Sequence, residues 1–269
     1  MILKDIKNYT EELKESYKQR ILKLNEAPKL AIVQVGENEA SNRYVKNKVK
    51  DCEEVGIIAD VYIYPENMTE FELDDELSHM YEYYNGIIVQ LPLPQHIRSS
   101  IAAAAIPADK DVDGFRHDSL FSPATPKGIM DYLKYCDYNL EGKNVVIIGR
   151  SNIVGKPLAK MMTDANATVS LCHSKTKNMS EYLFIADLIV SAVGKTNFLN
   201  CYPIYKPVID VGINFNKDGK LVGDCYNTEG RDVTPVPGGV GLLTRCALLE
   251  NVILSKEMEV YKNATKRMD

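Results

Sequence analysis

Tyr44 and Lys48 stand four positions apart in the stretch SNRYVKNKVK, and together they could carry out proton chemistry. Four residues make about one turn of an α-helix, so both side chains would lie on one face, about 6 Å apart along the axis. Val45, Val49 and Cys52 form a neighbouring apolar stripe with the spacing of a buried helix face. The Tyr–Lys pair therefore borders the core, either as the wall of a site or as a solvated edge.

Polar residues also follow segments that have the pattern of strands. GIIVQLPLP (86–94) is an apolar run that ends at Gln90 and two prolines, and KDVDGF carries Asp111 and Asp113 in a turn. Ligands bind at the carboxyl ends of strands in open α/β sheets, which makes these positions candidates for a site. Two acids in a turn are also ordinary turn-formers. The loop TPVPGGVG (234–241) is suited to close approach of the backbone to a flat ligand.

The stretch NVVIIGRSNIVGKPLA (144–159) has the order of a dinucleotide-binding element. A buried strand leads to a turn with Gly149 and Gly155, and a helix begins near Pro157. The amino end of such a helix offers free N–H groups to a pyrophosphate. Ser151 stands where the second glycine of G-x-G-x-x-G would be, so the order of elements carries this prediction. An ordinary turn between strand and helix is the alternative.

The end of the next strand indicates which nucleotide is bound. A site for NAD usually has an acidic residue there, which accepts from the ribose 2′-OH. The sequence here is SLCHSKTK, which presents His173, Ser174 and Lys175 and no carboxylate, and Arg150 follows the first glycine. Donors and cations suit a 2′-phosphate. We expect NADP as the cofactor, with NAD as an alternative.

The elements that must position these residues form two series of strands separated by helices. Strand patterns occur at 29–36, 56–64, 86–94, 144–149, 167–172, 187–194 and 207–213. This alternation predicts an α/β fold with two α/β domains around a cleft, the second a Rossmann-like NAD(P)-binding domain. We expect the domains at residues 1–120 and 121–241, with a helix at 242–269 that packs back on the first.

Composition excludes several classes of protein. The chain has 269 residues and a formal net charge of −5, which argues against nucleic acid as a partner. The charged, amphipathic amino terminus is neither a signal peptide nor a membrane span. The six cysteines have no metal-ligand spacing, so we expect reduced thiols, no metal site and a cytoplasmic location.

Taken in order, these segments resemble the bifunctional methylenetetrahydrofolate dehydrogenase/cyclohydrolases. The resemblance covers nearly the whole chain and rests on S-x-x-Y-V-x-x-K with the following E-x-G-I, GIIVQLPLP, KDVDG, TPKG, GRSxIVGxP, CHSKT and TPVPGGVG. That family oxidises 5,10-methylenetetrahydrofolate with NAD(P) and hydrolyses the methenyl product to 10-formyltetrahydrofolate. The resemblance therefore implies tetrahydrofolate derivatives as substrates and a homodimer as the assembly.

The resemblance also implies roles for individual residues. Lys48 would be the principal catalytic residue, Tyr44 would orient the folate, Gln90 would lie beside the lysine, and Asp113 would grip the N–H groups of the pterin. Hydride transfer needs no strong base, whereas hydrolysis needs a group that takes the proton from water, and burial favours the neutral amine that can do this. The expected cofactor-binding residues are Gly149, Arg150, Ser151, Ser174 and Ile213. The expected substrate-binding loop is Pro237, Gly238 and Gly239.

Two departures from the family pattern leave alternatives open. After TPVPGGVG the family usually continues P-M-T, whereas this chain has Leu242, Leu243 and Thr244, and the usual Gly-Lys pair before the first helix is absent. A dehydrogenase without cyclohydrolase activity is therefore one alternative, and a non-catalytic folate- or nucleotide-binding module is another. Short-chain dehydrogenases also use Tyr-x-x-x-Lys, but their glycine turn precedes the pair, whereas Gly149 follows it.

Overall fold

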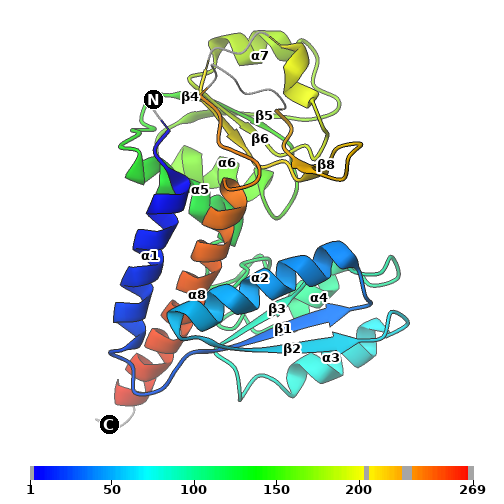
Figure 1. Cartoon of the computed structure of the whole chain (residues 1–269), viewed down its shortest axis with the longest axis vertical. Coiled ribbons are helices and arrows are strands. Elements are labelled where there is room, and N and C mark those ends of the chain that lie inside the picture. Colours follow the sequence, from blue (N-terminus) through cyan, green and yellow to red (C-terminus); the bar gives the residue numbers. More distant parts are fainter. Residues whose placement is uncertain (1–2, 203–205, 226–231, 266–269) are drawn as a thin grey trace. The chain divides into compact units, whose positions relative to one another are not determined.

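The computed structural model describes residues 3–202, 206–225 and 232–265, and the chain divides into two compact units. Glu12–Ala124 and Arg245–Asp269 form one, which we call the β1–β3 unit, and Met1–Glu11 and Thr125–Thr244 form the other, the β4–β7 unit. Each contains a parallel sheet with helices (Figure 1). The α/β fold predicted from the sequence is confirmed.

Helices and strands alternate along most of the chain. In order they are α1 (Ile6–Ile21), β1 (Lys29–Val35), α2 (Glu39–Val55), β2 (Ile58–Tyr64), α3 (Glu70–Ser78), β3 (Gly86–Val89), α4 (Ser99–Ala105), α5 (Ala124–Tyr135), β4 (Asn144–Ile148), α6 (Gly155–Asp164), β5 (Thr168–Cys172), α7 (Met179–Ile185), β6 (Leu188–Ser191), η1 (Phe198–Cys201), β7 (Val208–Asp210), β8 (Asn214–Phe215), β9 (Leu221–Val222) and α8 (Val240–Thr265). The segments predicted as strands contain β1 to β7.

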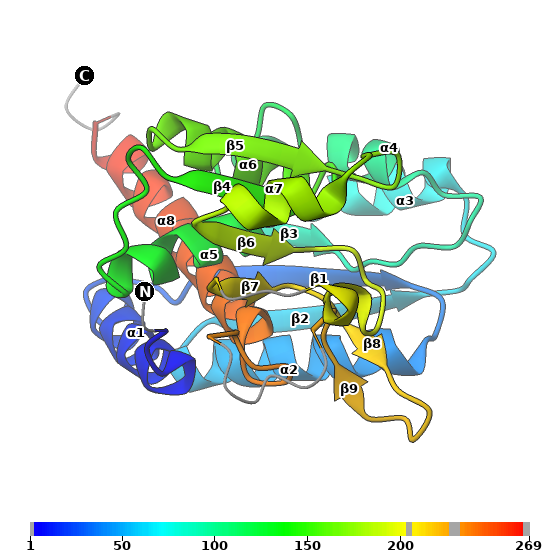
Figure 2. The same ribbon diagram turned by 90° about the horizontal axis from the view of Figure 1, so that it is seen from above.

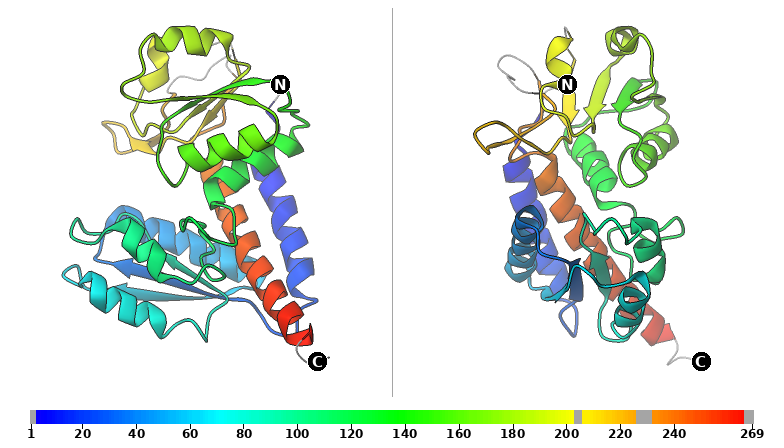
Figure 3. Two further views of the ribbon diagram at one scale, coloured as in Figure 1. Left: turned by 180° about the vertical axis from the view of Figure 1, so that it is seen from behind. Right: turned by 90° about the vertical axis from the view of Figure 1, so that its right-hand side faces the viewer.

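The β1–β3 unit has a three-stranded parallel sheet in the order β2-β1-β3, covered on both faces. On one face, Leu30 and Ile32 pack in a core with Val45 and Cys52 of α2 and with apolar residues of α8. On the other, the alternate residues of β1 pack against α3 and α4. The right-hand view of Figure 3 shows α2 and α3 on opposite sides of the strands. Burial on both faces explains why β1 is a continuous apolar run.

The β4–β7 unit has a four-stranded parallel sheet in the order β5-β4-β6-β7, visible from above in Figure 2. Chain order reverses at β4, since β5 lies on one side of it and β6 on the other. Such a reversal leaves a crevice at the carboxyl end of the strand, where doubly wound sheets bind ligands. The short antiparallel hairpin of β8 and β9 follows β7 and was not predicted from the sequence.

Among the helices of residues 3–202, 206–225 and 232–265, none combines the length and apolar character needed to cross a membrane.

Candidate active site

Helix α2 presents Tyr44 and Lys48 beside its buried face, as the spacing predicted. Val45 and Cys52 are buried in the core of the β1–β3 unit, and Val49 packs against it. Tyr44 and Lys48 are half-buried at the edge of this stripe. The two side chains are therefore held on a helix that the core fixes.

Lys48 forms an ion pair with Asp113. Its Nζ lies 4.0 Å from Asp113 Oδ2, and the two side chains are only 13% and 11% exposed. Water screens such a pair less than one on the open surface. The structure thus brings together two of the residues that the sequence predicted for the site, from α2 and from the loop between α4 and α5.

The turn that carries Asp113 is fixed by its backbone. Asp111, which is 1% exposed, accepts a hydrogen bond from the Arg116 N–H at 2.8 Å, and burial raises the pKa of its carboxyl. The carbonyl of Asp113 accepts from the Ala124 N–H. Gly114 has φ +70°, and a Cβ there would lie 2.6 Å from the nitrogen of Pro123. Only glycine fits at this point, because any other residue would add both a strained φ and a clash with Pro123.

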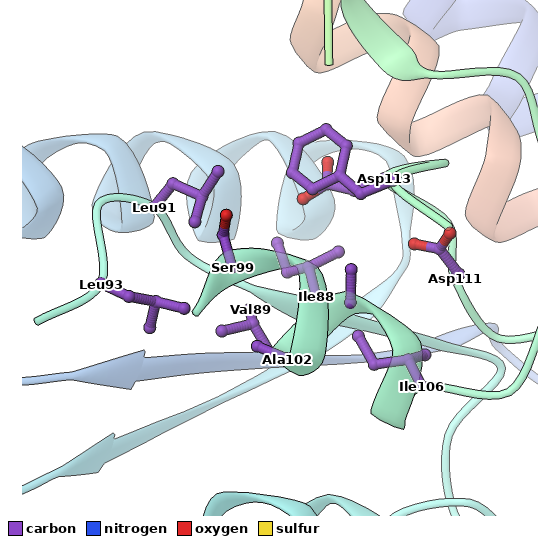
Figure 4. Close-up of a pocket in the computed structure, with 11 residues that line it drawn as sticks. Ile88, Val89, Leu91, Leu93, Ser99, Ala102, Ile106, Asp111 and Asp113 are labelled. Carbon is purple, nitrogen blue, oxygen red and sulfur yellow. The ribbon is translucent and has the colours of Figure 1, made fainter. Parts of the chain in front are cut away.

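A small pocket lies beside this turn, between the end of β3 and helix α4 (Figure 4). Asp111, Asp113 and Phe115 line it from the turn. The apolar lining from β3, its following loop and α4 consists of Ile88, Val89, Leu91, Leu93, Ala102, Ala103 and Ile106, with Ser99 at the start of the helix. Its free volume of about 10 Å³ is no more than one water molecule needs, so this pocket by itself does not hold a ring.

Gln90 follows directly after β3. Its backbone N–H donates to the Val33 carbonyl at 2.8 Å, and its side-chain Nε2 donates to the Leu91 carbonyl at 2.6 Å. Its Oε1 is buried and has no hydrogen-bond partner in the part of the chain that the structure describes. No hydrogen bond joins Gln90 to Lys48 among these residues. An unpaired buried acceptor is costly, which marks Oε1 as a position for a donor on a ligand or water.

Ser41 is a site candidate that the sequence reasoning did not single out. It is 3% exposed, and its Oγ is buried without a partner among the described residues. It precedes Tyr44 by three positions and Lys48 by seven, so all three share one face of α2. The signal in the sequence was the serine that opens S-x-x-Y-V-x-x-K, but its burial depends on the packing of α2.

Tyr44 is set up as a neutral phenol. Burial raises its pKa above the ordinary value of 10.0, and Arg43 and Arg245 act in the opposite direction with a smaller effect. A phenol with a raised pKa donates a hydrogen bond or stacks on a ring and does not act as a base near neutral pH.

The glycine turn after β4 has Ser151 where the second glycine of the usual motif would stand. Ser151 Oγ accepts from the N–H groups of Val154 at 3.1 Å and Gly155 at 3.4 Å, so it caps the start of α6. A Cβ on Gly155 would lie 1.9 Å from the carbonyl oxygen of Gly149. The backbone N–H groups of residues 150–153 have no hydrogen-bond acceptor among the residues that the structure describes. These are free donors for an anion.

The strand register brings the other cofactor candidates to the same edge of the sheet. Ile148 pairs with Cys172 and with Ser191, and Ser191 pairs with Asp210. The loops that leave these strands therefore start side by side. They carry the exposed residues Arg150, Ser174 and Ile213. A polar hollow after β5 has the cations Lys175 and Lys177 in its lining, together with His173 and the carboxylate of Glu181.

The loop before α8 lies in the β4–β7 unit. Pro237 and Gly238 are exposed and Gly239 is buried. The Leu242 N–H donates to the Gly239 carbonyl at 2.9 Å, and α8 begins at Val240. The helix thus starts two residues before the expected Leu242 and does so without the proline that the family usually has. Leu243 is buried, with 1% of its surface exposed.

Comparison with known proteins assigns both units of the chain to one family of enzymes. Residues 4–113 match the tetrahydrofolate dehydrogenase/cyclohydrolase catalytic domain, and residues 123–260 match the NAD(P)-binding domain of the same enzymes. The bifunctional protein FolD of Campylobacter concisus is 43% identical over an alignment 283 positions long, which covers 98% of this chain and 100% of that protein.

Two solved structures have the same fold. The bifunctional FolD methylenetetrahydrofolate dehydrogenase/cyclohydrolase of Campylobacter jejuni has a TM-score of 0.89 and 42% identity, covering 95% of this chain and 98% of that one. The dehydrogenase-cyclohydrolase of Trypanosoma brucei, complexed with NADP cofactor and inhibitor, has a TM-score of 0.88 and 27% identity, covering 96% of this chain and 98% of that one.

A doubly wound sheet with a glycine turn at its reversal point, and a second α/β unit with a lysine site, define a two-domain dinucleotide-dependent oxidoreductase. The family matches narrow this class, because they cover both units of the chain. The chain belongs to the tetrahydrofolate dehydrogenase/cyclohydrolase family and is an enzyme with both of these activities.

Proposed function

We propose that one folate site, built around Lys48, serves both reactions. The chain oxidises 5,10-methylenetetrahydrofolate to the methenyl form with NADP and then hydrolyses that product to 10-formyltetrahydrofolate. In this proposal residues 1–120 and 242–269 form the folate domain and residues 121–241 the NADP domain. The observation that carries it is the buried Lys48–Asp113 pair, which joins a group able to move a proton to a group able to hold a pterin.

On the substrate side, Asp113 accepts from the amino and ring N–H groups of the pterin, as a carboxylate can do with both oxygens. Tyr44 and the loop Pro237-Gly238-Gly239 orient the ring system. A carboxylate that is occupied by two N–H donors attracts Lys48 less strongly. Substrate binding would therefore release Lys48 from its ion pair at the moment when the amine is needed.

For oxidation, bound NADP supplies the acceptor for the hydride of the methylene carbon. The chain itself must hold and orient. The free N–H groups after Gly149, together with Arg150 and Ser151, bind the phosphates, Ser174 binds near the ribose, and Ile213 packs beside the nicotinamide. The absence of a carboxylate after β5 and the exposed Arg150 support NADP over NAD.

For hydrolysis, water adds to the cationic methenyl carbon and the bond from that carbon to one ring nitrogen breaks. Of the two protons of the water, one ends on this nitrogen and the other is released. Lys48 in its amine form takes the proton from the attacking water. The unpaired Oε1 of Gln90 accepts a hydrogen bond from that water and orients it. Neither step needs a metal ligand from the protein.

Isotope transfer tests the first reaction directly. With substrate deuterated at the methylene carbon, we expect deuterium in the reduced NADP and a methenyl product that retains one label. Reduced cofactor without deuterium would show that the hydride comes from another position, and the assignment of the substrate carbon would be wrong.

We propose that the enzyme is a homodimer joined through β2. This strand is at the edge of its sheet, and Ile58, Val61 and Ile63 on it are 47%, 39% and 56% exposed. An apolar edge strand invites pairing with a second copy. Sedimentation should show a dimer that Ile63→Lys converts to a monomer, while Phe71→Lys, on the exposed face of α3, leaves it intact. A monomeric wild-type chain would contradict the proposal.

We propose a cytoplasmic location. Its support is that Cys52, Cys136 and Cys172 are free thiols in the described structure, as is usual in a reducing compartment. Fractionation of cells that make the tagged chain should recover it with cytoplasmic markers, and recovery with exported proteins would contradict this.

A further inference from the structure

Two buried carboxylates lie side by side in the β4–β7 unit, and no step above uses them. Asp210 ends β7 and is 1% exposed, and Asp224 follows β9 and is 0% exposed. The Asp224 N–H donates to Asp210 Oδ1 at 3.0 Å. Carboxylates are rarely buried so fully unless their oxygens are satisfied by several donors.

Both oxygens of the Asp224 carboxylate accept hydrogen bonds. Its Oδ2 accepts from the Ser191 hydroxyl at 2.7 Å and from the Val193 N–H at 2.9 Å. Its Oδ1 accepts from the Lys195 N–H at 2.8 Å and from Asn214 Nδ2 at 3.1 Å. Each carboxylate oxygen thus uses two acceptor positions, and one side chain ties the loop after β6 to the start of β8.

Asp210 holds the backbone on the other side of Ile213. It accepts from the N–H of Gly212 at 2.9 Å and from that of Cys225 at 2.8 Å. Ile213 is therefore held between two anchored neighbours, Gly212 on Asp210 and Asn214 on Asp224. Its own side chain is 48% exposed, and it stands at the sheet edge where the glycine turn after β4 also begins.

We propose that Asp224 is a positioning residue for hydride transfer, because it holds the loop 193–195 and Ile213 in the arrangement that receives the nicotinamide. The inference rests on the proposed function, in which Ile213 packs beside that ring. The phosphates are bound elsewhere, at residues 149–151. Asp224 consequently governs the geometry of the reacting end of the cofactor more than the strength of cofactor binding.

Asp224→Asn is the substitution that separates these effects. It preserves the shape of the side chain but replaces one acceptor oxygen with an NH₂ group, which faces two donors. At least one backbone N–H, of Val193 or of Lys195, then loses its acceptor, and the loop shifts to find another. A small displacement of a reacting ring is enough to slow transfer strongly.

The two activities of the chain supply an internal control. Dehydrogenase activity is measured with 5,10-methylenetetrahydrofolate and NADP, and cyclohydrolase activity with preformed methenyltetrahydrofolate and no cofactor. We expect Asp224→Asn to lower the dehydrogenase kcat by about twentyfold or more, to raise the KM for NADP by less than about threefold, and to change the cyclohydrolase by less than about twofold. Asp218→Asn, at the exposed tip of the same hairpin, should change neither.

An equal fall in both activities would show a merely structural role, and a dehydrogenase kcat within about twofold of the wild type would show no role. Either result overturns the proposal. If Asp224→Asn does not fold, Asn214→Ala, which removes one of the four donors, replaces it in the same comparison, with a selective loss of about threefold or more expected. A wild-type chain without dehydrogenase activity would contradict the proposed function itself, and is distinguished by that measurement alone.

Discussion

The ammonium of Lys48 lies 4.0 Å from the carboxylate of Asp113, and both side chains are largely withdrawn from solvent. One residue comes from helix α2, and the other comes from a turn at which only glycine fits next to Pro123. The pair couples the group proposed to move a proton with the group proposed to hold the substrate. A ligand that occupies Asp113 changes the electrostatic surroundings of Lys48 in the same event.

Lys48→Met is expected to abolish hydrolysis of methenyltetrahydrofolate, by about a hundredfold or more, because no amine remains to take the proton from water. NADP should still bind, since its proposed ligands lie in the other unit. The measurement is cyclohydrolase rate together with NADPH fluorescence titration. Lys46→Met, at an exposed position of the same helix, is the control. Unimpaired hydrolysis in Lys48→Met would show that Lys48 is not the base that takes the proton from water.

Asp113→Asn is expected to raise the KM for the folate substrate by about tenfold or more, because the amide replaces one of the two acceptor oxygens with a donor. Steady-state kinetics with varied folate at saturating NADP measure this. Asp74→Asn, exposed on α3, should leave the KM unchanged. An unaltered KM in Asp113→Asn would mean that the pterin binds elsewhere.

Gly114→Ala is expected to destabilise the chain by about 2–4 kcal/mol, because it adds a clash with Pro123 to the strain of a positive φ. Gly219→Ala is the matched control, since Gly219 has φ +71° and nothing lies within 4 Å of the added Cβ. That variant should lose only about 1 kcal/mol. Urea denaturation followed by circular dichroism compares them, and equal losses would show that the clash with Pro123 is relieved.

Arg150→Ala is expected to lower kcat/KM for NADP by about tenfold and that for NAD by about twofold or less, because only NADP carries the 2′-phosphate. Lys160→Ala, which removes an exposed cation further along α6, serves as the comparison. A uniform loss with both cofactors would place Arg150 at the shared pyrophosphate and not at the 2′-phosphate.

The Glu70–Arg98 pair should make stability depend on acid pH. Arg98 donates to Glu70 through its side chain and its backbone N–H, which lowers the pKa of the Glu70 carboxyl from 4.5 to about 2. A lowered folded-state pKa gives stability that is complete above 4.5 and is lost as the pH falls toward 2. The melting temperature of Glu70→Gln should fall less steeply across this pH window than that of the wild type. Glu82→Gln, a variant at an exposed position, should behave like the wild type. Parallel curves would contradict the coupling.

Much of the fold could be predicted from the sequence because its signals are local. The β-branched apolar runs mark β1 and β4, and the stripe of Val45 and Cys52 identifies the buried face of α2. The same spacing placed Tyr44 and Lys48 on one edge of that face. The order of strand, glycine turn and helix at 144–164 could also be predicted, although Ser151 breaks the usual motif.

Other parts of the site depend on contacts between distant segments. The Lys48–Asp113 pair exists because α2 and a turn far along the chain meet at one edge of the sheet. Burial of the Ser41 hydroxyl follows from packing that no local pattern records. The hairpin of β8 and β9 escaped prediction because strands of two residues are too short to show alternation, and the network around Asp224 depends on that hairpin.

In the proposed sequence of reactions, one chain forms methenyltetrahydrofolate and then consumes it. The most direct test is a near-ultraviolet time course with 5,10-methylenetetrahydrofolate and excess NADP, repeated with NAD and with an enzyme-free control. We expect methenyl product to accumulate, faster with NADP than with NAD, and then to decay faster than in the control. Formation followed by decay at the background rate would leave a dehydrogenase alone, and no formation with either cofactor would contradict the account.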